Sequence, residues 1–150
     1  DEAVRAFGTS ATLAAEPGPR ARARLGLATA LRIQDRYDEA LEVLQAAERD
    51  ASDEGEPRRL ARVWTLRGNL HFPRGDMERC LHAHQRALEL ARASGSVEDV
   101  ARALGGLSDA EDQRGRMRTA LALHASDFVA HYVFDSAEPV DFNTHPITFA

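Results

Sequence analysis

The sequence predicts an all-α solenoid built from antiparallel helix pairs, and three observations lead to that prediction. Residues 67–90 read as a helix, a tight Gly75-Asp76 turn and a second helix that folds back on the first. Related residues recur every 40 positions along the chain. The expected helices also carry apolar residues at the i, i+3, i+4 spacing of a buried stripe.

The Gly75-Asp76 turn is the strongest local signal. Gly75 can adopt the left-handed backbone that ends a helix, and the Asp76 carboxylate can cap the helix that follows. We therefore expect two antiparallel helices to meet at this turn. The second helix carries small or apolar side chains at Met77, Cys80, Leu81, Ala87, Leu88 and Leu90.

The period of 40 residues extends over three copies. Repetition on this scale predicts a stack in which each helix pair buries its apolar face against its neighbours. We call a set of residues that lie 40 positions apart a column. The columns that show the period are Tyr37, Met77 and Met117; Ala40, Cys80 and Ala120; and Leu41, Leu81 and Leu121.

The block around the turn resembles a tetratricopeptide repeat (TPR). Cys80 stands where that family usually has a small Ala, and Trp64 stands where it often has Trp. The resemblance implies a right-handed superhelix whose inner wall is made by the first helix of each repeat, where peptides or partner helices dock. The residues in matching columns are Gly68, His71, Phe72, Gly75, Asp76, Ala87 and Leu88.

A narrower resemblance concerns residues 67–73, 101–107 and 114–120. These stretches are similar to TPR arrays at the C-terminal end of large bacterial proteins that pair a nucleotide-cyclase or regulatory module with an AAA-type ATPase. The similarity covers about residues 20–123 and implies a sensor or assembly arm. Neither catalytic module is present in this sequence, so the resemblance assigns no catalytic residue.

The array is expected over residues 1–125, followed by an atypical segment over 126–150. It begins with the trailing second helix of a partial repeat at 1–17, which suggests a piece of a longer protein. Complete repeats are then expected at about 18–55, 56–95 and 96–134.

Proline and polar residues set the expected helix boundaries. Pro17-Gly18-Pro19 is expected to end the first helix near Ala15, with the next helix over about 20–34. A polar connector at 52–57 is expected to end in the helix-initiating Pro57. Ser96 and Asp99 resemble a capping box that begins a helix over about 97–113. The second helix of the first complete repeat is expected over about 38–51. The first helix of that repeat offers five residues for burial: Leu25, Leu27, Ala28, Leu31 and Ile33.

Residues 126–150 differ in character because they contain no Arg and carry five of the nine aromatic residues. We expect a helix to about Phe134 and an extended segment beyond it. Three readings remain open: a cap on the last repeat, a segment that lies in a groove of this molecule or a neighbour, and an atypical chain end. The aromatic residues are Phe128, Tyr132, Phe134, Phe142 and Phe149.

Composition narrows the class of protein. The net charge is −5 and the 19 basic residues, all Arg, are spread along the sequence, which weighs against a nucleic-acid partner. No apolar run approaches the ~18 residues of a membrane span. The single cysteine excludes an internal disulfide and fits a cytoplasmic location.

Two groups of residues were weighed as chemical sites. Cys80, His82 and His84 include metal-binding side chains, but Cys80 lies in a small buried column and further ligands are missing. The second group shares one side of a helix, where a carboxylate could orient an imidazole for proton transfer or bind a metal. Solvent-exposed charge contacts are the better explanation of this group. No nucleophile motif or phosphate loop accompanies either group, so we expect no enzyme, metal or cofactor. The second group is His124, Asp127, His131 and Asp135.

The expected function is protein–protein interaction, as a scaffold or regulatory module of a larger bacterial signalling protein. Its partner would be a protein or peptide, and self-association through the solenoid ends or the C-terminal segment is a further possibility. The alternatives are a small-ligand sensing domain of a transcription regulator and a metal or enzymatic site on the His124–Asp135 helix face. By register with the TPR family, the inner wall would present Leu25, Thr29, Arg32, Arg62, Thr65, Asn69, Phe72, Arg102, Asp109 and Asp112.

Overall fold

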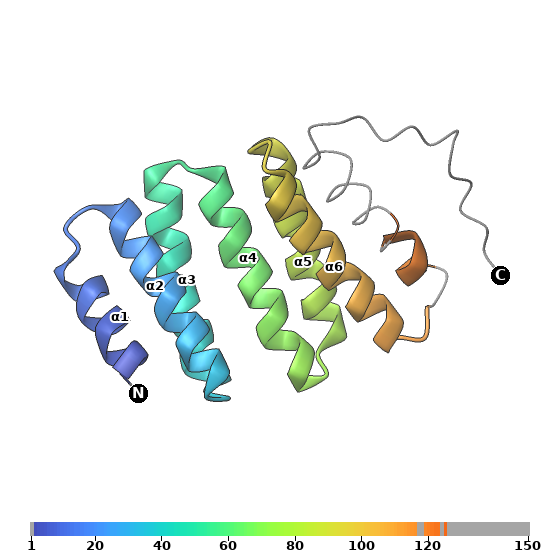
Figure 1. Cartoon of the computed structure of the whole chain (residues 1–150), viewed down its shortest axis with the longest axis horizontal. Helices are drawn as coiled ribbons and strands as arrows, with labels where there is room; N and C mark the ends of the chain where they lie inside the picture. Colours follow the sequence, from blue (N-terminus) through green and yellow to red (C-terminus); the bar gives the residue numbers. More distant parts are fainter. Residues whose placement is uncertain (1, 117–118, 124, 126–150) are drawn as a thin grey trace, which may run out of the picture.

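Helices follow one another side by side along the chain in the computed structural model (Figure 1). The structure describes residues 2–116, 119–123 and 125. No residue in these ranges lies in a strand. The helices are α1 (Glu2–Leu13), α2 (Pro17–Ile33), α3 (Tyr37–Glu54), α4 (Pro57–His71), the short 3-10 turn η1 (Phe72–Arg74), α5 (Met77–Ala93) and α6 (Val97–Gln113).

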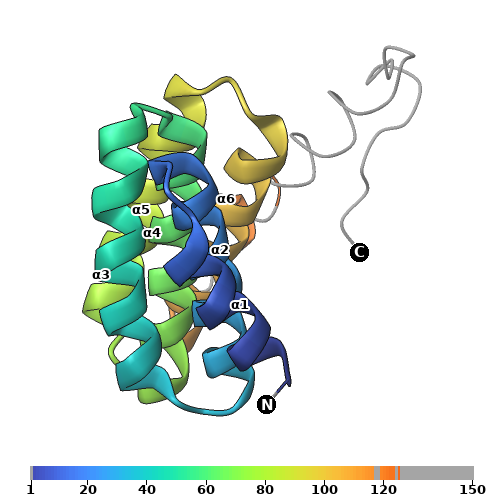
Figure 2. The same cartoon turned by 90° about the vertical axis from the view of Figure 1, so that its left-hand side faces the viewer.

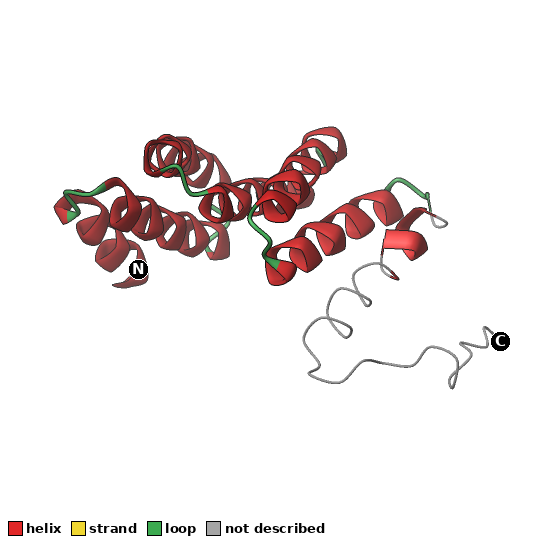
Figure 3. Cartoon of the chain, turned by 90° about the horizontal axis from the view of Figure 1, so that it is seen from above, coloured by secondary structure: helices red, strands yellow, loops and turns green. Residues whose placement is uncertain are grey.

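The helices form two layers. α2 packs against α3 and α4 packs against α5, and the two helices of each pair run in opposite directions (Figure 1). Short loops join successive helices (Figure 3). α2 also contacts α4, and α4 contacts α6, so the first helices of successive pairs lie in one layer. Viewed along the stack, α3 and α5 lie on the other side of the molecule (Figure 2). This arrangement is the predicted all-α solenoid of helix pairs.

The core lies between the two layers and is shared by neighbouring pairs. In one cluster Leu31 of α2, Leu44 of α3 and Leu70 of α4 pack together. A second cluster joins α5 and α6 through Leu88 and Leu104. Since each cluster draws on successive helices, burial stabilises the fold from neighbour to neighbour. The predicted small column is buried throughout, at Ala40, Cys80 and Ala120.

The predicted Gly75-Asp76 turn is confirmed. Gly75 has a φ angle of 73°, in the left-handed region that favours glycine, and its N–H donates to the Phe72 carbonyl. The Asp76 carboxylate accepts a hydrogen bond from the Arg79 backbone N–H at 3.2 Å. The predicted helix start at Ser96 is also confirmed, because the Ser96 hydroxyl accepts from the Asp99 backbone N–H. The reciprocal bond of a capping box is absent, since the Asp99 carboxylate accepts from the Ser96 hydroxyl and the Ser96 N–H donates to the Ala91 carbonyl.

Two predicted boundaries were wrong. The first helix does end before Pro17, at Leu13, but α2 begins at Pro17 rather than at about 20. The missing N–H of Pro17 costs nothing there, because it would have no partner within the helix. α3 continues three residues beyond its expected end, to Glu54, because the polar residues at 52–54 form an exposed last turn before Gly55. Polarity alone therefore does not mark a connector.

One predicted core residue was also wrong. Ile33 is 72% exposed, whereas Leu31, two residues earlier, is buried. Residues two apart on a helix point to nearly opposite sides, so both cannot face the core. Leu25 and Leu27 are partly buried against the core, and Ala28 is fully buried.

Beyond α6, residues 119–123 and 125 are helical. The predicted continuation to Phe134 and the segment 126–150 lie outside the described residues. Within the described part, none of the helices is long and apolar enough to cross a membrane.

Candidate partner-binding site

The layer of first helices contains an open groove of about 740 Å³, lined by residues of α2, α4 and α6 together with the α3–α4 loop. We call it the α2–α4–α6 groove. A smaller hollow of about 420 Å³, the Asn69 pocket, is lined by Asn69, Phe72, His84 and Asp109 among others. Arg32 and Asn69 line both, so the two hollows adjoin.

The structure brings together nearly all the residues that were predicted for the inner wall. Asn69 lies where the groove and the pocket meet, and Phe72 and Asp109 line the pocket. Asp112 lines neither hollow. Asp112 shares a column with Arg32 and Phe72. It lies on α6, however, and in the described part of the chain no later repeat contributes a first helix beside it. The predicted residues that line the groove are Leu25, Thr29, Arg32, Arg62, Thr65, Asn69 and Arg102.

The period of 40 explains this arrangement. Thr29, Asn69 and Asp109 occupy one column, which stacking places on successive first helices. Arg22, Arg62 and Arg102 occupy another. Arg22 was missed in the sequence reading, together with Arg58 and Arg59, although the arginine column at positions 22, 62 and 102 was a visible signal.

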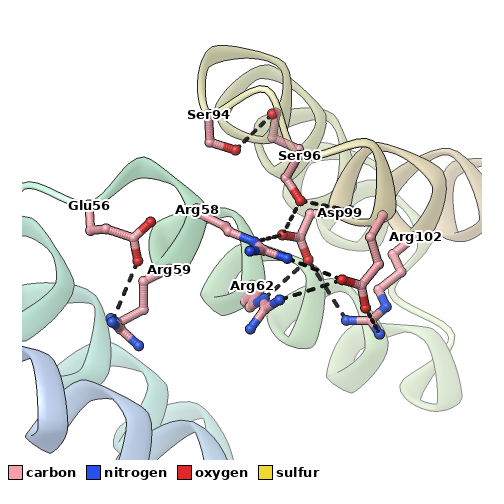
Figure 4. A network of polar contacts seen from close by, with 10 residues as sticks. Glu56, Arg58, Arg59, Arg62, Ser94, Ser96, Asp99 and Arg102 are labelled. Atoms are coloured by element: carbon pink, nitrogen blue, oxygen red, sulfur yellow. Dashed lines mark hydrogen bonds and ion pairs between the residues drawn. The ribbon is translucent and has the colours of Figure 1, made fainter. Parts of the chain in front are cut away.

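Asp99 organises the arginines on α4 and α6 (Figure 4). Its side chain is 1% exposed and lies in the first turn of α6, where a carboxylate also interacts favourably with the helix dipole. The Arg58 Nε–H donates to Oδ2 at 2.9 Å and the Arg62 Nε–H donates to Oδ1 at 3.1 Å. Arg102 lies 3.7 Å from Oδ1, and the Ser96 hydroxyl donates to Oδ2 at 2.7 Å.

The environment favours the charged form of this carboxylate. Burial raises the pKa of Asp99, but hydrogen bonds from Ser96, Arg58 and Arg62 outweigh burial and hold the pKa below its ordinary value. Glu98 adds a second carboxylate at the rim, 3.1 Å from Arg58 and 2.6 Å from Arg102. The cluster therefore ties α4 to α6 and fixes the directions of three guanidinium groups.

Replacing Asp99 with asparagine should destabilise the protein by about 1 kcal/mol, because the charged acceptor is lost while the exposed arginines can turn to water. Urea unfolding followed by circular dichroism at neutral pH measures this. Asp53→Asn, at an exposed position on α3, is the matched control and should change stability by less than about 0.5 kcal/mol. Equal effects of the two substitutions would contradict the anchoring role of Asp99.

The remaining arginines of the groove differ in how firmly they are held. Arg59 pairs with Glu54 at 2.5 Å and with Glu56 at 3.5 Å. Among the described residues, Arg22 and Arg32 form no ion pair, and the buried Nε of Arg32 has no hydrogen-bond partner. The groove thus contains guanidinium groups that form no ion pair with any described residue.

His84 closes the floor of the Asn69 pocket. It occupies the column of Leu44 in the previous repeat, and like Leu44 it is fully buried. Its ring lies against two glycines, since a Cβ atom built on Gly68 or Gly106 would fall 2.4 or 2.2 Å from ring atoms. The buried Nδ1 forms no hydrogen bond, and burial lowers the pKa of His84 to about 4.

The geometry gives no support to a metal site at Cys80, His82 and His84. Burial, with smaller contributions from Asp109 and Asp76, raises the pKa of the Cys80 thiol to about 11, which disfavours the thiolate that metals bind. The exposed His82 packs edge-on against Trp64, with ring centroids 5.8 Å apart. Within the described ranges, no three His, Cys, Asp or Glu side chains gather to hold a metal ion. The second predicted group, His124, Asp127, His131 and Asp135, lies outside the described residues.

A third hollow, of about 850 Å³, lies among α1, α2 and α3, away from the predicted wall. Its ionic centre is Asp50, which is 4% exposed and accepts from Arg20 at 2.9 Å and from Arg24. Both arginines are on α2 and Asp50 is on α3, so this group fastens the two helices of one pair together. Its geometry is explained by the fold itself.

Comparison with known proteins agrees with this architecture. The tetratricopeptide repeat family matches residues 59–126. The crystal structure of BtubC (BKLC) from P. vanneervenii is similar with a TM-score of 0.71 at 16% sequence identity, over 88% of this chain and 54% of that chain. The chain therefore spans about half the length of that protein. A comparison with curated protein sequences gave no match. The fold is an all-α TPR solenoid, and TPR repeats generally mediate protein–protein interaction.

Proposed function

We propose that this chain is a protein-interaction module that binds an extended peptide segment of a partner along the α2–α4–α6 groove. The observation that carries the proposal is the groove itself, which the three first helices line with side chains from matching columns. Thr29 and Asn69 offer exposed polar groups there, beside unpaired guanidinium donors. Extended peptides bind such surfaces through hydrogen bonds and side-chain pockets.

The wider setting is also part of the proposal. The resemblance of residues 67–73, 101–107 and 114–120 to bacterial TPR arrays supports a regulatory or scaffolding arm of a larger signalling protein. Such an arm would work in the cytoplasm, where the single buried cysteine stays reduced. Catalysis would belong to other modules of that protein.

Phage display tests this function. Random peptides are selected for binding to the full chain, and the affinity of each selected peptide is then measured by titration. The double variant Thr29→Ala/Asn69→Ala removes two exposed side chains from one column of the groove. We expect it to weaken binding of the selected peptides about tenfold, since two polar contacts are lost.

The matched control is Gln45→Ala/Gln85→Ala, which removes two exposed side chains from one column of α3 and α5 in the other layer. We expect it to leave peptide binding unchanged. Peptides that bind the groove variant as tightly as the original chain would remove the groove from consideration. Failure to select any peptide would count against the interaction function as a whole.

A second candidate function is recognition of a small polar molecule in the Asn69 pocket. The favouring observation is the buried His84 Nδ1 without a hydrogen-bond partner beside the pocket lined by Asn69 and Asp109. A ligand that binds there would raise the thermal unfolding temperature of the protein, and Asn69→Ala would reduce that rise. A metabolite screen by thermal shift that gives no stabilisation would argue against this candidate.

A further inference from the structure

The α2–α4–α6 groove is basic, although the chain as a whole is acidic. The net charge of the sequence is −5. Among the residues that line the groove, however, six are arginines and only two, Glu56 and Asp99, are acids. Basic residues that are spread along the sequence are therefore concentrated in space on the wall where a partner is proposed to bind.

The repeat itself produces this concentration. Arg22 on α2, Arg62 on α4 and Arg102 on α6 are each 40 residues apart, and all three line the groove. Because α2 contacts α4 and α4 contacts α6, this column forms a strip across the layer. We call it the arginine strip. Arg32 adds a fourth guanidinium where the groove meets the Asn69 pocket.

Internal ion pairs leave much of this positive charge accessible. Asp99 is 1% exposed, whereas its partners Arg62 and Arg102 are 42% and 55% exposed. The counter-charge is thus buried while the guanidinium groups reach the groove surface. Arg58, Arg62 and Arg102 share two carboxylates, those of Glu98 and Asp99.

Arg22 and Arg32 contribute charge without a close ion-pair partner. The pKa of Glu54 is lowered mainly by its hydrogen bond with Arg59, and the more distant charge of Arg22 adds to this effect. Neither Arg22 nor Arg32 forms an ion pair in the part of the chain that the structure describes, and the buried Nε of Arg32 lacks any hydrogen bond. An arginine fork matches the two oxygens of a carboxylate, and such charge-assisted hydrogen bonds are stronger than neutral ones. Arg22 is exposed and Arg32 is partly exposed, so both line the groove with charge that no close carboxylate of the described residues neutralises.

We infer that the occupant of the groove is an acidic segment of a partner protein, whose Asp or Glu side chains bind the arginine strip and Arg32. This inference rests on the proposed function and specifies its ligand. A peptide is favoured over a nucleic acid because acids border the basic wall: Glu98 is half exposed at the rim, and Asp109 lines the adjoining pocket. The separate carboxylates of a peptide can be spaced so that they do not lie against Glu98 and Asp109. A nucleic acid carries a phosphate at every nucleotide, so its backbone would be repelled by these acids.

The test uses the full chain and a fluorescein-labelled peptide of alternating Glu and Ser, with a Gln-Ser peptide of the same length as the neutral control. Fluorescence anisotropy measures binding. We expect the Glu peptide to bind at least about tenfold more tightly than the Gln peptide, and its affinity to fall as salt is raised. A labelled single-stranded oligothymidylate of equal charge is the polyanion control and should bind more weakly than the Glu peptide.

Matched variants locate the binding. Arg22→Gln/Arg32→Gln removes two charges from the groove without breaking an internal ion pair of the described residues. Arg5→Gln/Arg92→Gln removes two exposed charges on α1 and α5, outside the groove, and changes the net charge equally. We expect about a tenfold loss of Glu-peptide affinity in the first and less than about a twofold loss in the second. Thermal melts confirm that both variants are folded.

Three results would overturn the inference: equal affinity for the Glu and Gln peptides, equal losses in the two double variants, or tighter binding of the oligothymidylate through Arg22 and Arg32. These outcomes can be told apart from a failure of the proposed function. If phage display selects peptides that need Thr29 and Asn69 but carry no acids, peptide binding stands and the acidic ligand is excluded. If no selected peptide depends on the groove, both proposals fail.

Discussion

Lowering the pH from 6.5 to 4 should reduce the free energy of unfolding by about 3 kcal/mol through one buried histidine, His84. The residue is 1% exposed and its ring packs against Gly68 and Gly106, with no hydrogen bond at Nδ1. An imidazolium there would lose its hydration without gaining an acceptor at that nitrogen. Burial accordingly lowers the pKa of His84 from 6.5 to about 4.

The sign follows from proton uptake. Between pH 6.5 and about 4, the unfolded chain binds a proton at this histidine that the folded protein does not, so acid favours unfolding. Above pH 6.5 both states are neutral at this site, and below about 4 both are protonated. The loss of stability should therefore be confined to this window. His71, whose pKa burial also lowers, adds a loss of the same sign.

A histidine variant isolates the contribution of His84. His84→Phe keeps a flat ring between the two glycines and cannot take a proton. Urea unfolding of both proteins at several pH values from 7 to 4 gives the stability of each. The original chain should lose about 3 kcal/mol more than the variant over this range. Parallel stability curves for the two proteins would show that His84 is not responsible.

The role of His84 shows where sequence reasoning reached its limit. The i, i+4 spacing of Cys80 and His84 raised a metal site, which the buried thiol and the isolated imidazole do not support. The better signal was the column, because Leu44 lies 40 residues earlier and is fully buried. A column predicts burial, but the pattern along one helix cannot show that glycines on two other helices make room for the ring.

Local signals predicted the fold well where they had only one physical solution. The Gly75-Asp76 turn needs a left-handed residue and a cap, and the structure has both. The N-cap at Ser96 was equally direct. Pro17 allowed two interpretations, because a proline can follow the end of one helix or be the first residue of the next.

The residues that line the α2–α4–α6 groove and the Asn69 pocket were predictable in part for the same reason. The TPR register led to Thr29, Asn69 and Asp109, which stacking places along one wall. The basic character of the groove was not predicted, because Arg22, Arg62 and Arg102 are far apart in sequence and read as scattered charge. Only the period of 40, applied to polar residues as well as to the core, brings them together.

Replacing Gly106 with alanine should destabilise the protein by about 2 kcal/mol, although alanine is the better helix former. The new methyl group would lie 2.2 Å from Cε1 of His84, far inside van der Waals contact. The ring has little room to retreat, because Gly68 also lies against it and α5 holds its backbone. The helices α4, α5 and α6 would have to separate to admit the methyl group.

The same substitution at Gly8 provides a matched control. A Cβ atom there meets nothing within 4 Å, so Gly8→Ala should stabilise α1 by about 0.5–1 kcal/mol through helix propensity alone. Urea unfolding at pH 7 measures both variants. If Gly106→Ala lowers the free energy of unfolding and Gly8→Ala raises it, the cost at Gly106 comes from its contact with His84. If Gly106→Ala stabilised the protein as well, the ring of His84 would have to be free to move.

A double substitution tests the contact itself. His84→Ala alone leaves a cavity, and Gly106→Ala alone creates an overlap. Combined, the new methyl group enters space that the imidazole has vacated, so the double variant should be more stable than the sum of the single effects by about 1 kcal/mol or more. Additive effects would mean that the two residues do not constrain each other. A favourable coupling would establish that Gly106 is present to admit the ring, and that the α5–α6 contact depends on this pair.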